Sequence, residues 1–307
     1  MNDTAPIIHA DNIEKNFAAL KAVDGVSFDI WPNSCVGLLG PNGAGKTTTM
    51  RMMMGLTTPS AGRLYMFNQP LEALNRQARA RIGLVPQDNN LDMDLSVEQN
   101  LWVYGHYYGL PKSYLQKRIP ELLAFMALED KKKAAVFGLS GGMKRRLIIA
   151  RALISDPDIV ILDEPTTGLD PQARMMIWHL LISLKKAGKT LLLTTHYMDE
   201  AARLCDNIVI IDAGRVLDEG TPQNLIDKHV ARTVLEMDKS FLEPSPQAQK
   251  ELERSVRYEQ VGENYIIYTN TPQNITQALP PNAEYTQRSA NLEDVFLCLT
   301  GRRLREA

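Results

Sequence analysis

Residues 40–47, GPNGAGKT, combine glycines with a lysine and a threonine in a spacing that suits phosphate binding. They match the pattern G-x-x-x-x-G-K-[ST], and here the segment follows a predicted strand and precedes a predicted helix. Glycines let successive backbone N–H groups turn towards a phosphate where side chains would collide. A turn without a ligand would explain the glycines, but it leaves the lysine and the hydroxyl unexplained. The segment therefore predicts a nucleotide phosphate site.

The last residues of this segment carry the expected phosphate and metal chemistry. We expect Lys46 to reach the β- and γ-phosphates and Thr47 to offer its hydroxyl to Mg²⁺. A helix that begins near Lys46 would add the positive end of its dipole. The predicted nucleotide contacts here are Gly40, Pro41, Asn42, Gly43, Ala44, Gly45, Lys46, Thr47 and Thr48.

Two carboxylates end a second segment, DIVILDE, at residues 158–164. Asp163 is expected at the carboxyl end of a buried strand, where open α/β sheets bind their ligands, so it is the predicted Mg²⁺ partner. Glu164 is predicted to act as a general base on water, a role worth roughly 10² to 10⁴ in rate. The alternative for Glu164 is a solvated loop carboxylate.

A single histidine ends a third apolar segment, TLLLTTH, at residues 190–196. If this segment is a strand of the same sheet, His196 lies on the same rim as Asp163, where the γ-phosphate is expected. A purely structural histidine is the alternative. We predict that His196 takes part in catalysis.

These residues need a largely parallel sheet to bring them together. Nearly continuous apolar runs predict strands that are buried on both faces and covered by helices, at residues 34–40, 158–163, 190–196 and 207–212. Clearer alternation at residues 7–12 and 26–30 predicts an antiparallel element beside that sheet. The predicted fold class is therefore α/β.

Two shifts in pattern divide the rest of the chain. From about residue 89 the pattern is helical, and Ser96 with Gln99 forms a capping-box signature, so we predict a helical subdomain at about 89–157. After residue 228, proline-containing breaks separate the strand-like YIIYT from the helix-like NLEDVFLCLTGRRL. We predict a large domain at 1–228 and a small α+β domain at 229–307, which lacks a catalytic constellation and serves dimer contacts or regulation.

Composition excludes several classes of protein. The chain has 307 residues, 44% of them hydrophobic, and a formal net charge of −2, which provides no overall field for nucleic acid. Its longest apolar run, residues 122–128, is far shorter than the roughly 20 residues of a membrane-spanning helix. We expect no secretory signal, and the three scattered cysteines favour a reducing compartment.

Several motifs, in order between about residues 7 and 225, resemble the ATP-binding cassette (ABC) family of ATPases. LSGGM at residues 139–143 is similar to the family's signature sequence, and TGLD, ending at Asp170, is similar to its D-loop. Gln87 in LVPQ matches its Q-loop, and His196 matches its switch histidine. The resemblance implies a P-loop NTPase core of the ABC type with an antiparallel β subdomain. It implies catalytic or metal-binding roles for Gln87 and nucleotide contact for Asp170.

The signature segment also has a physical rationale. Ser140, Gly141 and Gly142 precede a predicted helix, so they offer a hydroxyl, backbone donors and a helix N-terminus to an anion. Taken alone, SGG has a helix-initiating turn as its less favoured alternative. In the family, the phosphate loop of one subunit and the signature of another enclose ATP across a head-to-tail dimer. The resemblance therefore implies that two copies of this chain bind ATP and Mg²⁺ between them.

The sequence departs from the family pattern at two positions. Met143 replaces the usual glutamine of the signature, which removes one hydrogen-bonding side chain. Phe17 stands where the family has an adenine-stacking aromatic, usually tyrosine, and it keeps the π-face without the hydroxyl. The alternative for Phe17 is packing against the antiparallel strands.

The resemblance also implies a membrane partner. In the family, the helical subdomain docks a cytoplasmic helix of a separate permease, and the aromatic segment LWVYGHYYG at residues 101–109 is the candidate surface here. On the predicted helix, Leu101, Tyr104 and Tyr108 share one face, so a subdomain core is an equal alternative.

The whole arrangement resembles the bacterial branch that exports drugs and lipo-oligosaccharides such as nodulation factors, particularly in LSGGMKRRL, DEPTTGLDP and the closing LEDVFLCLTGRRL. This implies a peripheral protein at the cytoplasmic face of the bacterial inner membrane. The competing hypothesis is a soluble ABC ATPase that acts on nucleic acid or ribosomes, although the long coiled coil or second cassette usual there is missing. A third hypothesis, a nucleotide-regulated scaffold, would require an idle Glu164.

Overall fold

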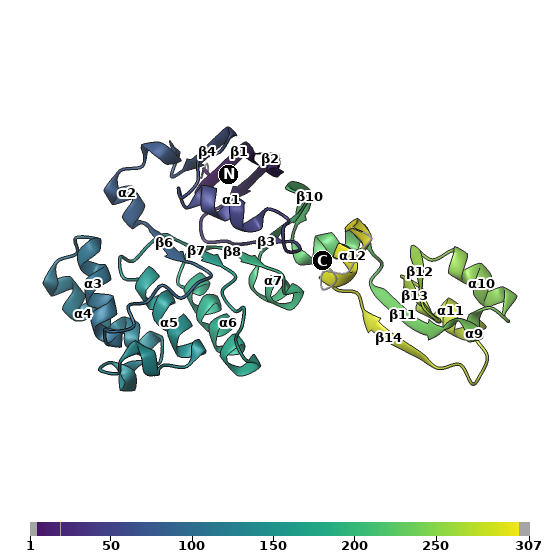
Figure 1. Cartoon of the computed structure of the whole chain (residues 1–307). Helices are drawn as coiled ribbons and strands as arrows, with labels where there is room; N and C mark the ends of the chain where they lie inside the picture. Colours follow the sequence, from purple (N-terminus) through teal and green to yellow (C-terminus); the bar gives the residue numbers. More distant parts are fainter. Residues whose placement is uncertain (1–4, 19, 301–307) are drawn as a thin grey trace. The chain divides into compact units, whose positions relative to one another are not determined.

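The computed structural model describes residues 5–18 and 20–300. They belong to two compact units, Met1–Leu217 and Asp218–Ala307. Figure 1 shows the chain coloured along its sequence, and each unit is described by itself.

A six-stranded sheet lies at the centre of the first unit, in the order β10-β9-β3-β8-β7-β6 (Figure 1). Its ladders from β9 to β6 are parallel, and β3, β7 and β8 are buried along their whole length, which confirms the predicted parallel sheet. The strands are β3 (Cys35–Leu39), β6 (Ile82–Val85), β7 (Ile159–Asp163), β8 (Thr190–Thr195), β9 (Asn207–Asp212) and β10 (Arg215–Gly220).

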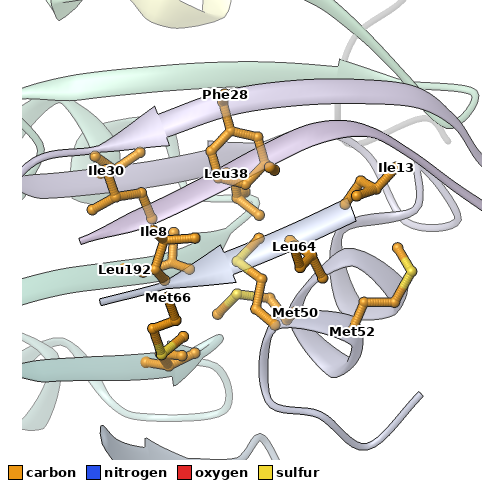
Figure 2. Packing of buried hydrophobic residues seen from close by; sticks show 14 of the residues in the cluster. Ile8, Ile13, Phe28, Ile30, Leu38, Met50, Met52, Leu64, Met66 and Leu192 are labelled. Carbon is orange, nitrogen blue, oxygen red and sulfur yellow. The ribbon is translucent and has the colours of Figure 1, made fainter. Parts of the chain in front are cut away.

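An antiparallel sheet in the order β2-β1-β4-β5 packs beside it, as predicted. Its strands are β1 (Ile8–Phe17), β2 (Leu20–Ile30), β4 (Ala61–Met66) and β5 (Gln69–Pro70). Helix α1 (Lys46–Met53) lies between the two sheets, and its methionines pack with residues of both, such as Leu64 and Leu192 (Figure 2). Flexible methionine side chains suit such an irregular interface. This core anchors the helix that begins at Lys46.

The remaining helices of this unit flank the central sheet and form the helical region. They are α2 (Arg76–Ala80), α3 (Val97–Tyr107), α4 (Lys112–Phe125), α5 (Gly141–Ala152), α6 (Pro171–Lys186) and α7 (Met198–Leu204). The capping box at the start of α3 is confirmed, because Ser96 Oγ accepts from Gln99 N at 3.2 Å and Gln99 Oε1 accepts from Ser96 N at 2.8 Å. Within the described residues, each helix is too short or too polar to span a bilayer.

The second unit has an antiparallel sheet in the order β12-β13-β11-β14, with helices that enclose a small core around Leu235 and Ile267. Its strands are β11 (Thr233–Asp238), β12 (Arg257–Val261), β13 (Asn264–Thr269) and β14 (Tyr285–Ser289). Its helices are α8 (Pro222–His229), α9 (Lys239–Leu242), α10 (Pro246–Glu253), α11 (Pro272–Ala278) and α12 (Leu292–Thr300). This is the small α+β domain predicted from the sequence. The part of the predicted closing helix after Thr300 lies outside the described residues.

The two units divide before residue 228, the boundary that the sequence predicts. Helix α8 packs against α12 of the second unit. Asp218 also forms ion pairs with Lys228 and His229, which tie the end of β10 to α8. These contacts group residues 218–228 with the second unit.

Candidate functional site

The phosphate loop joins the end of β3 to the start of α1, and two of its glycines occupy positions that exclude a side chain. A Cβ on Gly40 would lie 2.1 Å from the carbonyl oxygen of Ile211. Gly45 has φ +100°, and a Cβ there would lie 2.5 Å from the carbonyl oxygen of Ala22. No side chain caps the N-terminus of α1 at Gly45. The first N–H groups of this helix therefore remain open to an anion.

Lys46 crosses the loop from the first position of α1. Its side chain is buried, and Nζ donates to the carbonyl oxygens of Gly40 at 2.8 Å and Pro41 at 2.9 Å. Burial lowers the pKa of Lys46, while the carboxylates of Glu164 and Asp163 oppose that shift. The structure thus holds a cation inside the loop and close to both predicted acidic residues.

Asp163 is the last residue of β7, and Thr194 of the neighbouring strand β8 fixes its orientation. Thr194 Oγ1 donates to Asp163 Oδ1 at 2.6 Å and accepts from the backbone N–H of Glu164 at 2.9 Å. Burial raises the pKa of Asp163, and the hydrogen bond from Thr194 acts against this rise. Sequence reasoning missed Thr194. A strand alignment that pairs Asp163 with Thr194 would have identified it.

Glu164 adopts a left-handed backbone conformation, with φ +44°. Its Oε2 accepts from Thr167 Oγ1 at 2.9 Å and from Gln87 Nε2 at 3.3 Å. Thr167 is a second residue that sequence reasoning missed, although it lies three positions after Glu164 in EPTTGLD. A non-glycine residue in this region is strained, and such strain is concentrated at functional sites.

His196 follows β8 and faces the same carboxylate. Its Nδ1 lies 3.4 Å from Glu164 Oε1, which is close enough for an ion pair but lacks the alignment of a hydrogen bond. The neighbouring His196 is the main reason that the pKa of Glu164 is lowered, burial opposes the shift, and the hydroxyl of Thr167 adds to it. Glu164 is therefore ionised near neutral pH and can accept a proton.

One pocket of about 640 Å³ is bordered by Lys46, Glu164 and His196, but Asp163 is not among its lining residues. The pocket brings together the predicted residues Phe17, Asn42, Gly43, Gly45, Lys46, Thr47, Thr48, Gln87, Glu164 and His196. Phe17 is 48% exposed at its edge, and Lys15 Nζ lies 5.2 Å from the centre of its ring. A half-exposed ring at a pocket edge is available for stacking, and it is not part of the core between the sheets.

The signature residues lie in a second pocket of about 230 Å³, which is separate from the first. Ser140 caps α5, where its Oγ accepts from Met143 N at 3.3 Å, and Asp170 caps α6, where its Oδ1 accepts from Ala173 N at 2.9 Å. Ser140, Gly142 and Asp170 all line this second pocket. Gly141 is the first residue of α5. Within one copy, the predicted phosphate contacts of the phosphate loop and those of the signature therefore line different pockets.

The donor set near the phosphate loop suits Mg²⁺. Thr47 offers a hydroxyl, Asp163 a carboxylate, and Gln87 an amide oxygen that stays available because Nε2 donates to Glu164. Mg²⁺ prefers such oxygen ligands and is usually held by one or two protein groups together with phosphate oxygens and water.

Family models match both parts of the chain. The model described as ABC transporter matches residues 23–167. The model described as the C-terminal domain of the nodulation factor export protein NodI matches residues 245–301.

Curated relatives match along nearly the whole length. The Nod factor export ATP-binding protein I of Cupriavidus metallidurans is 49% identical over 98% of this chain and 99% of its own. The protein of the same name from Ralstonia nicotianae is 46% identical over 99% of this chain and 96% of its own.

Solved structures match the first unit's fold. One is cbiO1 from Clostridium perfringens, part of the ABC transporter complex cbiONQ, with a TM-score of 0.67 and 31% identity over 73% of this chain and 92% of that one. Another is a dimeric ATP-binding cassette in a post-hydrolysis state, bound to ADP and Pi, with a TM-score of 0.63 and 28% identity over 70% of this chain and 98% of that one.

Proposed function

The chain belongs to the ABC transporter family and is an ATP-hydrolysing subunit, and we propose that it powers lipo-oligosaccharide export through a separate permease. The observation that carries the cargo class is the 49% identity to a Nod factor export protein, which extends over 98% of this chain and so includes the second unit. A nodulation factor is the proposed cargo.

The proposed nucleotide contacts follow from the two pockets. Backbone N–H groups of residues 42–48 and the ammonium of Lys46 bind the phosphates of ATP in the first pocket. Phe17 stacks on the adenine at the edge of this pocket. Thr47, Asp163 and Gln87 hold Mg²⁺, which neutralises charge on the phosphate oxygens when it is bound.

For hydrolysis, the proposed base is Glu164. Its carboxylate is ionised near neutral pH and is held by Thr167, so it can accept a proton from water. Gln87 and His196 approach the same carboxylate from two sides, at 3.3 and 3.4 Å. They orient the attacking water and the γ-phosphate, which is the positioning that phosphoryl transfer requires.

The separation of the two pockets supports a head-to-tail homodimer. Ser140, Gly141, Gly142 and Asp170 of one copy contact the ATP bound to the phosphate loop of the other. Such a pair has two-fold symmetry, so each copy contributes both halves and two nucleotides are enclosed. The ATP-binding cassette that is 28% identical and was solved as a dimer bound to ADP and Pi supports this proposal.

We place the protein at the cytoplasmic face of a bacterial inner membrane, bound through the permease. The docking surface is the exposed side of α3, within the helical subdomain at 89–157, where Tyr107 is 72% exposed. We propose that residues 1–228 form the ATPase domain and that residues 229–307 serve dimer contacts or regulation. Action on nucleic acid or ribosomes is not favoured, because the curated relatives are export proteins.

Turnover by Glu164→Gln tests the ATPase mechanism. This variant should bind Mg·ATP, form a dimer with it, and hydrolyse it at least about tenfold more slowly, since the amide cannot accept the proton. Glu129→Gln, which changes an exposed carboxylate that lines neither pocket, should keep wild-type turnover. Unchanged turnover by Glu164→Gln would remove Glu164 from the mechanism, and a monomer at saturating Mg·ATP would exclude the dimer.

The cargo is tested on the complex captured from membranes. A lipo-oligosaccharide of the nodulation-factor class should stimulate ATP hydrolysis by the purified chain and permease, and the unacylated oligosaccharide is the matched control. Equal rates with and without the acylated compound would contradict the cargo while leaving the ATPase assignment intact.

A further inference from the structure

Arg145 lies in the second turn of α5 and is buried, with 5% of its surface exposed. All five N–H donors of its guanidinium point to main-chain carbonyl oxygens. Nε donates to Pro165 at 2.7 Å, Nη1 to Pro86 at 2.5 Å and Gln87 at 3.3 Å, and Nη2 to Asp163 at 2.9 Å and Glu164 at 3.0 Å. An arginine side chain has no further donor to offer.

The five carbonyls belong to two segments that are distant in sequence. One is the pair Pro86 and Gln87, and the other is residues 163–165, so a single planar group fixes the distance between them. The side chains of Gln87 and Glu164, which these segments carry, are 3.3 Å apart. The carbonyls of Asp163, Glu164 and Pro165 flank the left-handed conformation at Glu164, which needs support from its surroundings.

The guanidinium has no direct contact with a carboxylate among the hydrogen bonds of the described residues. Burial lowers the pKa of Arg145 to about 10, with Asp163, Glu200 and Glu164 nearby acting against the shift. Burying a cation is costly unless its hydrogen bonds are satisfied, and here carbonyl dipoles alone satisfy them. An apolar residue would fill the space without this cost, but it could not hold two segments of main chain.

The same helix is capped at its N-terminus by Ser140, which lines the second pocket. We infer that Arg145 is a positioning residue for hydrolysis, which links the position of the Ser140 helix to the placement of Gln87 and Glu164 in the same copy. This inference rests on the proposed roles of Gln87 and Glu164. A rigid helix transmits a shift at Ser140 by way of Arg145, so contact with the other copy's ATP adjusts the hydrolytic residues of this copy.

Two other buried arginines of α5 hold different segments. Arg146 donates to the carbonyls of Met126 at 2.5 Å and Ala127 at 2.9 Å, and Arg151 donates to the carbonyl of Asn90 at 2.7 Å. Arg151 also stacks on Tyr104, with its guanidinium carbon 4.0 Å from the ring centre. It therefore provides a control that is matched in burial, charge and helix, but that makes no hydrogen bond to residues 163–165.

The test compares Arg145→Lys with Arg151→Lys in the full-length protein. Lysine keeps the charge but not the planar fork, so Arg145→Lys should lower kcat at least about tenfold, with KM for ATP within about threefold of the wild type. Arg151→Lys should leave both within about twofold. If Arg145→Lys keeps wild-type kcat, or if it weakens ATP binding as much as it slows turnover, the inference is wrong.

A double-mutant comparison separates positioning from general destabilisation. In a Gln87→Ala background, Arg145→Lys should lower kcat by less than about threefold, because one of the groups that it positions is already gone. The same tenfold loss in both backgrounds would overturn the inference. If Glu164→Gln keeps full turnover, the proposed base is wrong. If Glu164→Gln is inactive while Arg145→Lys is fully active, only the role of Arg145 fails.

Discussion

Thr194 Oγ1 lies 2.6 Å from Asp163 Oδ1, across the ladder that joins β7 to β8. The same hydroxyl accepts the N–H of Glu164, so one buried side chain contacts both predicted acidic residues. The carboxylate that is proposed to bind Mg²⁺ is thus held in place by Thr194, to which the sequence analysis assigned no role.

Replacing Thr194 by valine should raise the Mg²⁺ concentration that ATP hydrolysis requires. The change removes a hydrogen bond that lowers the pKa of Asp163, so this pKa rises and the carboxylate binds a cation less well. A lost hydrogen bond to a charged group costs about 1.5 to 3 kcal/mol, so the Mg²⁺ concentration for half-maximal ATP hydrolysis should rise at least about tenfold. Thr194→Ser keeps the hydroxyl and should stay near the wild type. An unchanged Mg²⁺ requirement in Thr194→Val would contradict this role.

The contact between His196 and Glu164 should make stability depend on pH. The pKa of Glu164 is lowered from 4.5 in the folded protein, so its contribution to the free energy of unfolding is present above pH 4.5 and is lost as pH falls through the lowered pKa. His196→Ala removes the main cause of this shift. Urea denaturation from about pH 3.5 to about pH 7 measures the free energy of unfolding of His196→Ala and of the wild type. The variant should be less stable than the wild type at pH 7, and this difference should shrink as the pH falls. His179→Ala, which removes an exposed histidine of α6, is the control. If the loss of stability in His196→Ala grew as the pH fell, the predicted direction of the pH dependence would be wrong.

Two glycines of the phosphate loop should respond differently to alanine. At Gly40 the new Cβ would lie 2.1 Å from the Ile211 carbonyl, which is main chain and cannot move alone, so Gly40→Ala should lower the free energy of unfolding by at least about 2 kcal/mol. At Gly43 the space is open but φ is +79°, so Gly43→Ala should cost about 1 kcal/mol. Urea denaturation of both variants shows which substitution lowers the free energy of unfolding more. Equal costs would contradict the steric conflict expected between the new Cβ at position 40 and the Ile211 carbonyl.

The sequence predicted the parts of the site that depend on a few adjacent residues. The position of the phosphate loop between a strand and a helix, and that of Asp163 at a strand end, could be predicted because residue spacing and strand periodicity report local geometry. Thr194 and Arg145 were missed, since their partners are main-chain and side-chain groups brought together by strand register and helix packing. Both predicted sheets were confirmed. A strand that is buried on both faces has a continuous apolar run, whereas a strand that is buried on one face alternates apolar and polar residues, so the sequence distinguishes the two kinds.

The aromatic segment of α3 shows a further limit. Periodicity grouped Leu101, Tyr104 and Tyr108 on one face, but it could not show how far each is covered. In the structure Leu101 is fully buried, Tyr104 is partly covered by Arg151, and Tyr107 is 72% exposed. Exposure depends on α4 and α5, which pack against α3 and which no local pattern in this segment describes.

This division of α3 predicts which residue binds the permease. Tyr107 makes an edge contact with Tyr104, with ring centres 5.8 Å apart, and otherwise presents its ring to solvent. Tyr107→Ala should reduce permease co-purification at least about fivefold, because an exposed aromatic at an interface centre carries much of the binding energy. Its ATP hydrolysis without permease should stay within about twofold of the wild type. Leu101→Ala is the contrasting variant: it removes a core side chain and should cost about 2 to 5 kcal/mol of stability. Full co-purification of Tyr107→Ala would place the docking surface elsewhere on the helical region.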